Sequence, residues 1–387
     1  MAELTLTISQ PRRAYRIAVS FLFFLQGICF ASWASRIPSI QQNLQLSNGI
    51  LGIVLFALPV GSMLALPFAG WLVSRFGSKK TATLALILYS TLLLLLGLAQ
   101  NIIQLVTILI LYGMAGNTAN IAINTQAVGV EAKYNRSIMA SFHGLWSLAG
   151  FTAAGIGTIM IGQGILPTQH FTMVMVFILL GVTLSFNYLI NDEEKNTASQ
   201  KLFVKPDKSL INLGIIAFCC MICEGAMFDW SGIYFKKVVE VDPNWIGAGY
   251  TAFMSTMAIG RFIADWTTSR VGFKRTIQLS GCLIATGLLI AVIFPYLISS
   301  VIGFLLVGFG VSSVVPLVYS EAGKSKTLSA GAALAAVSSI GFLGFLAGPP
   351  LIGIVASIAS LRVSFLIIAL MGMSVIVIVG KLRNKSN

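Results

Sequence analysis

Twelve apolar stretches alternate with short polar segments along this 387-residue chain, and each is long enough to cross a lipid bilayer. A membrane-spanning helix needs about 20 mostly apolar residues, and a helix satisfies its own backbone hydrogen bonds in lipid. The pattern therefore predicts an all-α membrane protein with twelve transmembrane helices. The expected spans are 14–34, 48–73, 80–99, 102–129, 137–163, 170–190, 211–235, 245–269, 274–294, 299–321, 330–356 and 360–380.

One segment is repeated about half a chain later. Residues 71–81 read WLVSRFGSKKT and residues 266–276 read WTTSRVGFKRT, so six of eleven positions match at a shift of 195 residues. Internal repeats of this kind are typical of secondary transporters. The repeat predicts two pseudo-symmetric six-helix bundles, at residues 1–190 and 210–387, joined by a cytoplasmic linker at 191–209.

Composition and charge agree with a membrane protein and set its orientation. Hydrophobic residues make up 57% of the chain and charged residues 10%, whereas soluble domains carry about 25% charged residues. Twenty of the 25 Lys and Arg residues fall on the side of the N-terminus, in short clusters between spans. This distribution predicts that both termini lie in the cytoplasm and argues against a nucleic-acid partner. The opposite side holds Arg36, Lys236, Lys237 and Arg362.

Few residues could support a metal, a cofactor or catalysis. The histidines are His143 and His170, and all five cysteines lie within apolar runs, where they act as small packing residues. The sequence contains no glycine-rich phosphate loop and no nucleophile–histidine–acid set at a membrane interface. We therefore expect no metal, no cofactor and no enzyme activity. The expected partners are the lipid bilayer, protons and a small-molecule substrate. The protein is expected to be a monomer.

The loop after the second span, GWLVSRFGSK at residues 70–79, resembles the loop signature of the major facilitator superfamily, with Ser74 in place of the usual Asp. This resemblance implies a two-bundle fold and alternating access. Further strings resemble the YbjJ-like, fucose-permease-related branch, whose characterised sugar relatives are proton symporters. Relatives near fucose permease place acids in helices 1 and 4, where this chain has Gln26 and Asn120, which cannot titrate. The strings are residues 31–38, 143–148, 224–230, 260–262 and 347–353.

Three titratable residues within the spans are candidates for proton coupling. Inserting an ionisable side chain at membrane depth costs at least about 2.5–3.5 kcal/mol, so each such residue is expected to serve a function or to have a polar partner. Glu224 lies near the middle of its span and is the preferred proton carrier, with a hydrogen-bonded structural role as the alternative. Asp229 lies one turn further out and serves either coupling or a helix-end contact. His143 either relays protons and binds substrate or packs in the interior.

Polar and aromatic residues on the spans are candidates for substrate binding. Asn117, Asn120 and Asn124 share one helix face at offsets of three and seven. They bind a polar solute or hold helices together. For the aromatic candidates, the alternatives are packing and the interfacial aromatic belt. The predicted substrate-binding set is Gln26, Trp33, Asn117, Asn120, Asn124, His143, Trp146, Glu224, Trp230 and Tyr319.

Charged residues near the repeated loops predict a cytoplasmic gate. Arg261 and Asp265 are four residues apart on one helix and can pair. Gly77 and Gly272 are expected to form tight turns. The alternative for the basic residues is that they only fix the topology. The predicted gate comprises Arg75, Gly77, Lys79, Arg261, Asp265, Arg270, Lys274 and Glu321.

Together these features predict a secondary active transporter. Its expected cargo is a small polar organic solute, sugar-like in character, moved by alternating access in symport with protons. Efflux of amphipathic compounds by antiport and uncoupled facilitated diffusion are the alternatives.

Overall fold

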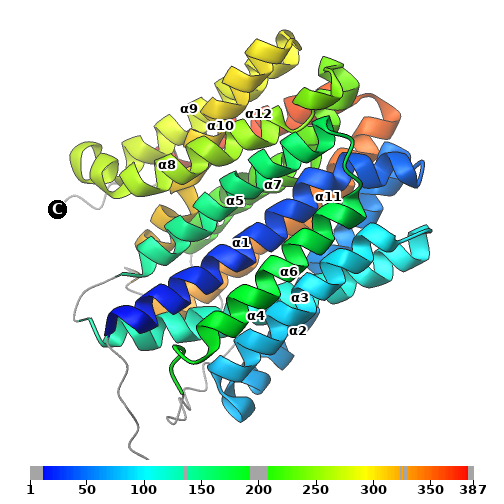
Figure 1. The fold of residues 1–387 in the computed structure, drawn as a ribbon. Coiled ribbons are helices and arrows are strands. Elements are labelled where there is room, and N and C mark those ends of the chain that lie inside the picture. Colours follow the sequence, from blue (N-terminus) through cyan, green and yellow to red (C-terminus); the bar gives the residue numbers. More distant parts are fainter. Residues whose placement is uncertain (1–11, 135–137, 192–207, 323–324, 326–329, 382–387) are drawn as a thin grey trace, which may run out of the picture.

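The computed structural model describes residues 12–134, 138–191, 208–322, 325 and 330–381, and most of the expected linker lies outside this part. The described residues form twelve α-helices, one π-helical turn and one 3₁₀ turn, with no strand, as the apolar pattern predicts (Figure 1). The helices are α1 (Arg12–Asn43), α2 (Asn48–Phe76), α3 (Ser78–Leu98), α4 (Ile102–Ala132), α5 (Met139–Gly162), α6 (Pro167–Phe186), α7 (Lys208–Tyr234), α8 (Ala248–Val271), α9 (Phe273–Ile293), α10 (Leu297–Ala322), α11 (Ala330–Ile358) and α12 (Leu361–Lys381), with turns η1 (Phe235–Val239) and η2 (Pro243–Trp245).

Eleven helices in the described part contain a stretch that is long and apolar enough to cross a membrane. The exception is α8, because Arg261 and several Ser, Thr and Gly residues lower its hydropathy. It nevertheless packs along α10 and α5 as part of the same bundle array. The polar character of α8 is therefore accommodated by protein contacts on both sides.

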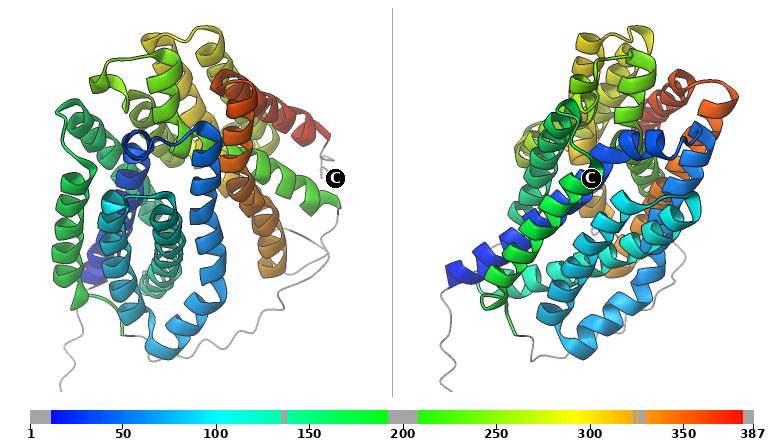
Figure 2. Two further views of the ribbon diagram at one scale, coloured as in Figure 1. Left: turned by 90° about the vertical axis from the view of Figure 1, so that its right-hand side faces the viewer. Right: turned by 45° about the vertical axis from the view of Figure 1, so that its right-hand side comes forward.

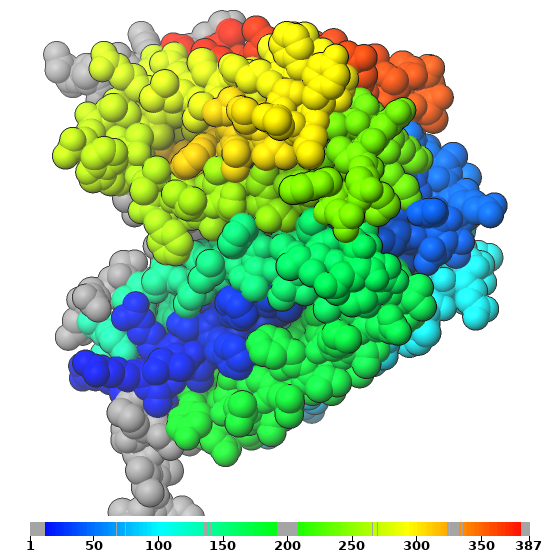
Figure 3. Space-filling view, turned by 45° about the horizontal axis from the view of Figure 1, so that its top comes forward, coloured from blue at the N-terminus to red at the C-terminus, as the bar shows by residue number. Residues whose placement is uncertain are grey.

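Helix contacts repeat with a shift of six helices. α1 packs on α5 as α7 packs on α11, α2 on α4 as α8 on α10, and α3 on α6 as α9 on α12. Contacts between the halves follow the same symmetry, because α2 packs on α11 and α8 packs on α5. The chain thus forms two pseudo-symmetric six-helix bundles, which lie side by side in the ribbon views and meet along a seam on the surface (Figures 2 and 3).

The two halves are sealed at the end where α1 meets α2, the upper right of Figure 1, which we call the α1–α2 end. Gly52 and Gly353 bring two backbones together there: an added Cβ would lie 2.6 Å from Pro349 O or 2.7 Å from Asn48 O. Nζ of Lys237 donates to Oδ1 of Asn48 at 2.9 Å. Further bonds between the halves at this end join Lys236 to Gln42 and Thr158 to Thr251.

Arg36 lies inside α1 rather than in an outer loop, which corrects the charge assignment made from sequence. Its side chain is 1% exposed, and its Nε donates to Nδ1 of His170 on α6 at 3.1 Å. Nη2 of Arg36 and Nε2 of His170 have no hydrogen-bond partner among the described residues. The helix continues beyond the expected end of the span at residue 34, and His170 on α6 supplies an acceptor for the buried Arg36 that the local sequence does not show.

The repeated loops form the same turn in both halves, at the opposite end of the bundle (the α2–α3 end). Gly77 and Gly272 have φ values of 81° and 83° and each joins two helices without an intervening loop. The hydroxyls of Thr81 and Thr276 then donate to the carbonyls of these glycines, at 2.8 and 2.9 Å. The repeat therefore encodes a shared backbone conformation that a side chain at the glycine would strain.

We expect Gly77→Ala and Gly272→Ala each to lower the free energy of unfolding by about 1–3 kcal/mol, because both backbones lie in a region used almost solely by glycine. Unfolding of the purified protein in mixed micelles by increasing SDS would measure this. Gly70→Ala is the control: its added Cβ meets nothing within 4 Å and its helical backbone suits alanine. Equal stability of all three variants would contradict the prediction.

Candidate functional site

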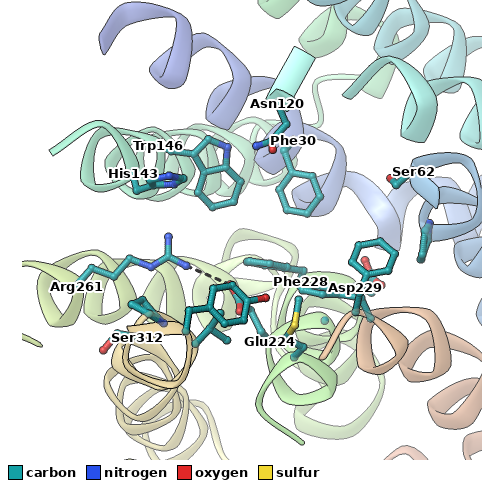
Figure 4. Close-up of a pocket in the computed structure, with 18 of the residues that line it drawn as sticks. Phe30, Ser62, Asn120, His143, Trp146, Glu224, Phe228, Asp229, Arg261 and Ser312 are labelled. Atoms are coloured by element: carbon teal, nitrogen blue, oxygen red, sulfur yellow. Dashed lines mark hydrogen bonds and ion pairs between the residues drawn. The ribbon is translucent and has the colours of Figure 1, made fainter. Parts of the chain in front are cut away.

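A cavity of about 710 Å³ lies between the two halves (Figure 4). Its described lining comes from α1, α2, α4 and α5 of the N-terminal half and from α7, α8, α10 and α11 of the C-terminal half. Both bundles therefore contribute equivalent helices. A chamber shared in this way changes shape whenever one bundle moves against the other.

Aromatic rings form the middle of the cavity wall. Phe30 meets Phe228 edge-on across the two halves at 5.1 Å between ring centroids, and Trp146 lies 5.8 Å from Phe30. Phe228 also stacks on Phe345 at 6.3 Å. Phe30 and Phe228 were not among the residues predicted from the sequence, although each lies four residues after a predicted polar site residue and so shares its helix face. That spacing was the signal that could have identified them.

Arg261 on α8 links the acidic centre of the cavity to the opposite bundle. Its Nη2 lies 3.3 Å from Oε1 of Glu224, and Glu224 is 8% exposed. Its Nη1 donates to Oγ of Ser147 on α5 at 2.5 Å, and its guanidinium lies 5.9 Å from the centroid of the Trp146 ring. Arg261 was predicted as part of an end gate, but the structure places it within the cavity.

The other two coupling candidates also line the cavity. The His143 ring packs edge-on against Phe23, at 5.2 Å between centroids, and is exposed to the cavity. Asp229 is half-buried and has no hydrogen bond or ion pair with any described residue. Figure 4 shows Asp229 on the far side of Glu224 from Arg261. The described lining of the cavity thus holds one paired and one unpaired carboxylate.

A side chamber of about 190 Å³ branches from the cavity into the N-terminal half. Gln26, Asn117 and Asn120 line it, so three predicted substrate-binding residues lie together. Nε2 of Gln26 donates to the carbonyl of Gly116 at 3.2 Å, and Nδ2 of Asn117 donates to the carbonyl of Ser62 at 2.6 Å. Asn120 also lines the main cavity, so it stands where the two spaces join.

Three predicted substrate-binding residues lie outside the cavity lining, while Tyr319 and Trp146 lie within it. Asn124 donates from Nδ2 to the carbonyl of Asn120 at 2.8 Å, which ties it to its own helix. Trp33 and Trp230 are 2% and 0% exposed, and neither Nε1 has a hydrogen-bond partner among the described residues. Both tryptophans pack inside the protein rather than at a membrane interface.

The remaining gate candidates lie around the α2–α3 end. Arg75 lies over Trp71 at 5.8 Å and Arg270 over Trp266 at 4.4 Å, so the same pairing occurs in both halves. Lys79 lies over a ring of α6 at 4.3 Å. Glu321 is at the C-terminal turn of α10 and Lys274 at the start of α9. The side chain of Asp265 lies outside the described residues.

Comparison with known proteins agrees with this architecture. Residues 19–328 match the sequence model of the Major Facilitator Superfamily. The chain is 32% identical over 367 residues to an uncharacterized MFS-type transporter of Yersinia pestis, covering 95% of each. It is 30% identical over 365 residues to the membrane protein MosC of Rhizobium meliloti, covering 92% of this chain and 88% of that protein.

A solved structure of the nucleoside transporter NupG has the same fold. The two structures superpose with a TM-score of 0.76 at 13% sequence identity. The match covers 95% of this chain and 100% of the NupG chain. At this identity the likeness concerns the fold and not the cargo. Together with the family match and the shared cavity, it leads to one conclusion. The chain belongs to the Major Facilitator Superfamily and is a multi-pass membrane transporter.

Proposed function

We propose that this transporter takes up a small polar organic solute in symport with protons, and that Glu224 carries the proton. The observation that carries the proposal is the Arg261–Glu224 pair inside a cavity shared by both halves. The resemblance to the fucose-permease-related branch, with its proton symporters, supports the same mechanism. The proposed location is the bacterial inner membrane with both termini in the cytoplasm.

Protonation of Glu224 would act through Arg261. A proton added to the carboxylate forms a neutral carboxylic acid, which removes the charge that Arg261 pairs with at 3.3 Å. The guanidinium also donates to Ser147 in the opposite bundle. A buried pair of this kind contributes little net stability when intact, but its loss leaves a charge without a partner. Proton binding thereby alters a contact that joins the two halves.

The positive-inside rule indicates which end of the protein faces the cytoplasm. The α2–α3 end carries the clustered Lys and Arg residues, so it faces the cytoplasm, and the sealed α1–α2 end faces outward. The structure then corresponds to an inward-facing state. Transport requires the Gly52–Gly353 contact to open and the α2–α3 ends to approach each other, by rocking of one bundle against the other.

Replacing the proposed carrier should separate solute movement from proton movement. Liposomes containing the protein and a pH dye would be screened with neutral sugars and nucleosides, and any solute found would be tested on Glu224→Gln. We expect Glu224→Gln to exchange labelled solute across the membrane without acidifying the lumen, because an amide cannot carry a proton.

The matched control is Glu240→Gln, which removes an exposed carboxylate outside the cavity and should leave coupling intact. Solute uptake by the unmodified protein without proton movement would refute symport. Continued acidification by Glu224→Gln would refute this residue as the carrier.

A reversible cross-link at the sealed end tests alternating access independently of protons. A Cβ added at Gly49 would lie 3.3 Å from Cβ of Ser357, close to the separation found in disulfides. We expect Gly49→Cys/Ser357→Cys to lose transport on oxidation and regain it on reduction, because the bond holds the outer end shut. Each single cysteine variant, oxidised in the same way, is the control. Full transport by the cross-linked protein would exclude movement at this end.

A further inference from the structure

The polar groups of the cavity differ in whether the protein already satisfies them. Ser62, Asn117 and Ser312 donate to backbone carbonyls, and Glu224 and Arg261 pair with each other. Other polar groups have no partner among the described residues. They include Oε1 of Gln26, the side-chain amide of Asn120, the imidazole of His143 and the carboxylate of Asp229.

Gln26 carries the strongest indication that a ligand group belongs in the side chamber. Its side chain is 6% exposed, and its Nε2 is fixed by the Gly116 carbonyl, which leaves Oε1 as a buried acceptor without a donor. An unsatisfied buried acceptor costs about 1–3 kcal/mol, so a donor is expected there in the working protein. The chamber wall also includes Tyr89 and Tyr112, stacked at 4.2 Å, and none of the described residues that line it is charged.

The charges of the main cavity restrict the ligand further. When Glu224 and Asp229 are both ionised, Arg261 and Glu224 neutralise each other, and the described charged lining carries one net negative charge, on Asp229. In this proton-free state an anionic solute would approach the Asp229 carboxylate while Arg261 is still paired with Glu224. A hydroxyl or a cationic group would instead donate to it.

The aromatic wall supplies the remaining part of the recognition. Phe30 and Trp146 line both the side chamber and the main cavity, and Phe228 meets Phe30 from the opposite half (Figure 4). Such rings accommodate the flat apolar face of a ring-shaped solute. A solute bound against these rings would have the unsatisfied acceptors of the protein at its edges. Gln26 and Asn120 would face one edge, and Asp229 would face another.

We infer that the substrate is a hydroxyl-rich ring compound, neutral or cationic but not anionic, and that the Gln26–Asn120 chamber is its specificity subsite. This inference rests on the proposed function in that it assigns the cargo of the same cavity. It gives Asp229 a role in recognition and leaves proton transfer to Glu224.

Ligand binding without a proton gradient tests this inference separately from coupling. The purified full chain in detergent would be titrated with glucose, glucosamine and glucuronate, and with adenosine and adenosine 5′-monophosphate, following the thermal unfolding midpoint. Ligands that bind the folded state raise that midpoint. At alkaline pH, where Asp229 is ionised, we expect a neutral or cationic member to bind and its anionic counterpart to bind roughly tenfold or more weakly, because of repulsion by Asp229.

Variants assign the effect to the two parts of the site. Asp229→Asn should remove most of the discrimination against the anion. Gln26→Met keeps the side-chain length and removes the acceptor, so binding of the preferred ligand should weaken roughly threefold to tenfold. Gln278→Met on α9 makes the same change outside both chambers and should leave binding unchanged. If Gln26→Met does not fold, Asn120→Ala tests the same subsite.

Three results would overturn the inference. They are an anionic member that binds as tightly as its neutral counterpart, no binding by any member of either series, and a Gln26→Met effect no larger than that of Gln278→Met. Loss of proton coupling with this binding pattern intact would instead refute the proposed mechanism alone. Intact coupling with the opposite binding pattern would refute the substrate class alone.

Discussion

Hydrocarbon offers no hydrogen-bond partner to a peptide group, and this constraint organises the whole molecule. The backbone satisfies itself within helices, and polar side chains are directed toward protein rather than lipid. Ser62, Thr118 and Thr158 illustrate the outcome, because each hydroxyl donates to a carbonyl one turn earlier on its own helix. A polar atom that lines the cavity and has no hydrogen-bond partner is therefore an exception. The proposed substrate class depends on these atoms.

Much of the fold could be predicted from sequence because the bilayer imposes a length and a periodicity on each element. The twelve apolar runs and the repeated loop gave the helices and the pseudo-symmetry. Arg36 shows where this reasoning fails: charge counting assumes that a basic residue near a helix end is solvated. Its burial against His170 depends on a contact 134 residues away in sequence, which no local pattern reveals.

The candidate site was predictable in part for the same reason. Isolated polar residues within apolar runs, such as Asn120, His143 and Glu224, do line the cavity. Helical spacing places residues on a face but does not say which neighbour covers that face, so Trp33 and Trp230 were assigned to substrate and lie packed in the interior. Arg261 was assigned to an end gate because Asp265 lies four residues away on the same helix, whereas the partner in the structure, Glu224, lies on a different helix.

The seal at the α1–α2 end is made largely where Gly52 and Gly353 let two backbones touch. Peptide atoms there are the same whatever the neighbouring side chains, so this barrier has no chemical preference among solutes. Discrimination is left to the chamber beneath it. Cargo preference can consequently diverge among descendants of such a chain through changes in the chamber, while the moving parts that shut it are inherited intact.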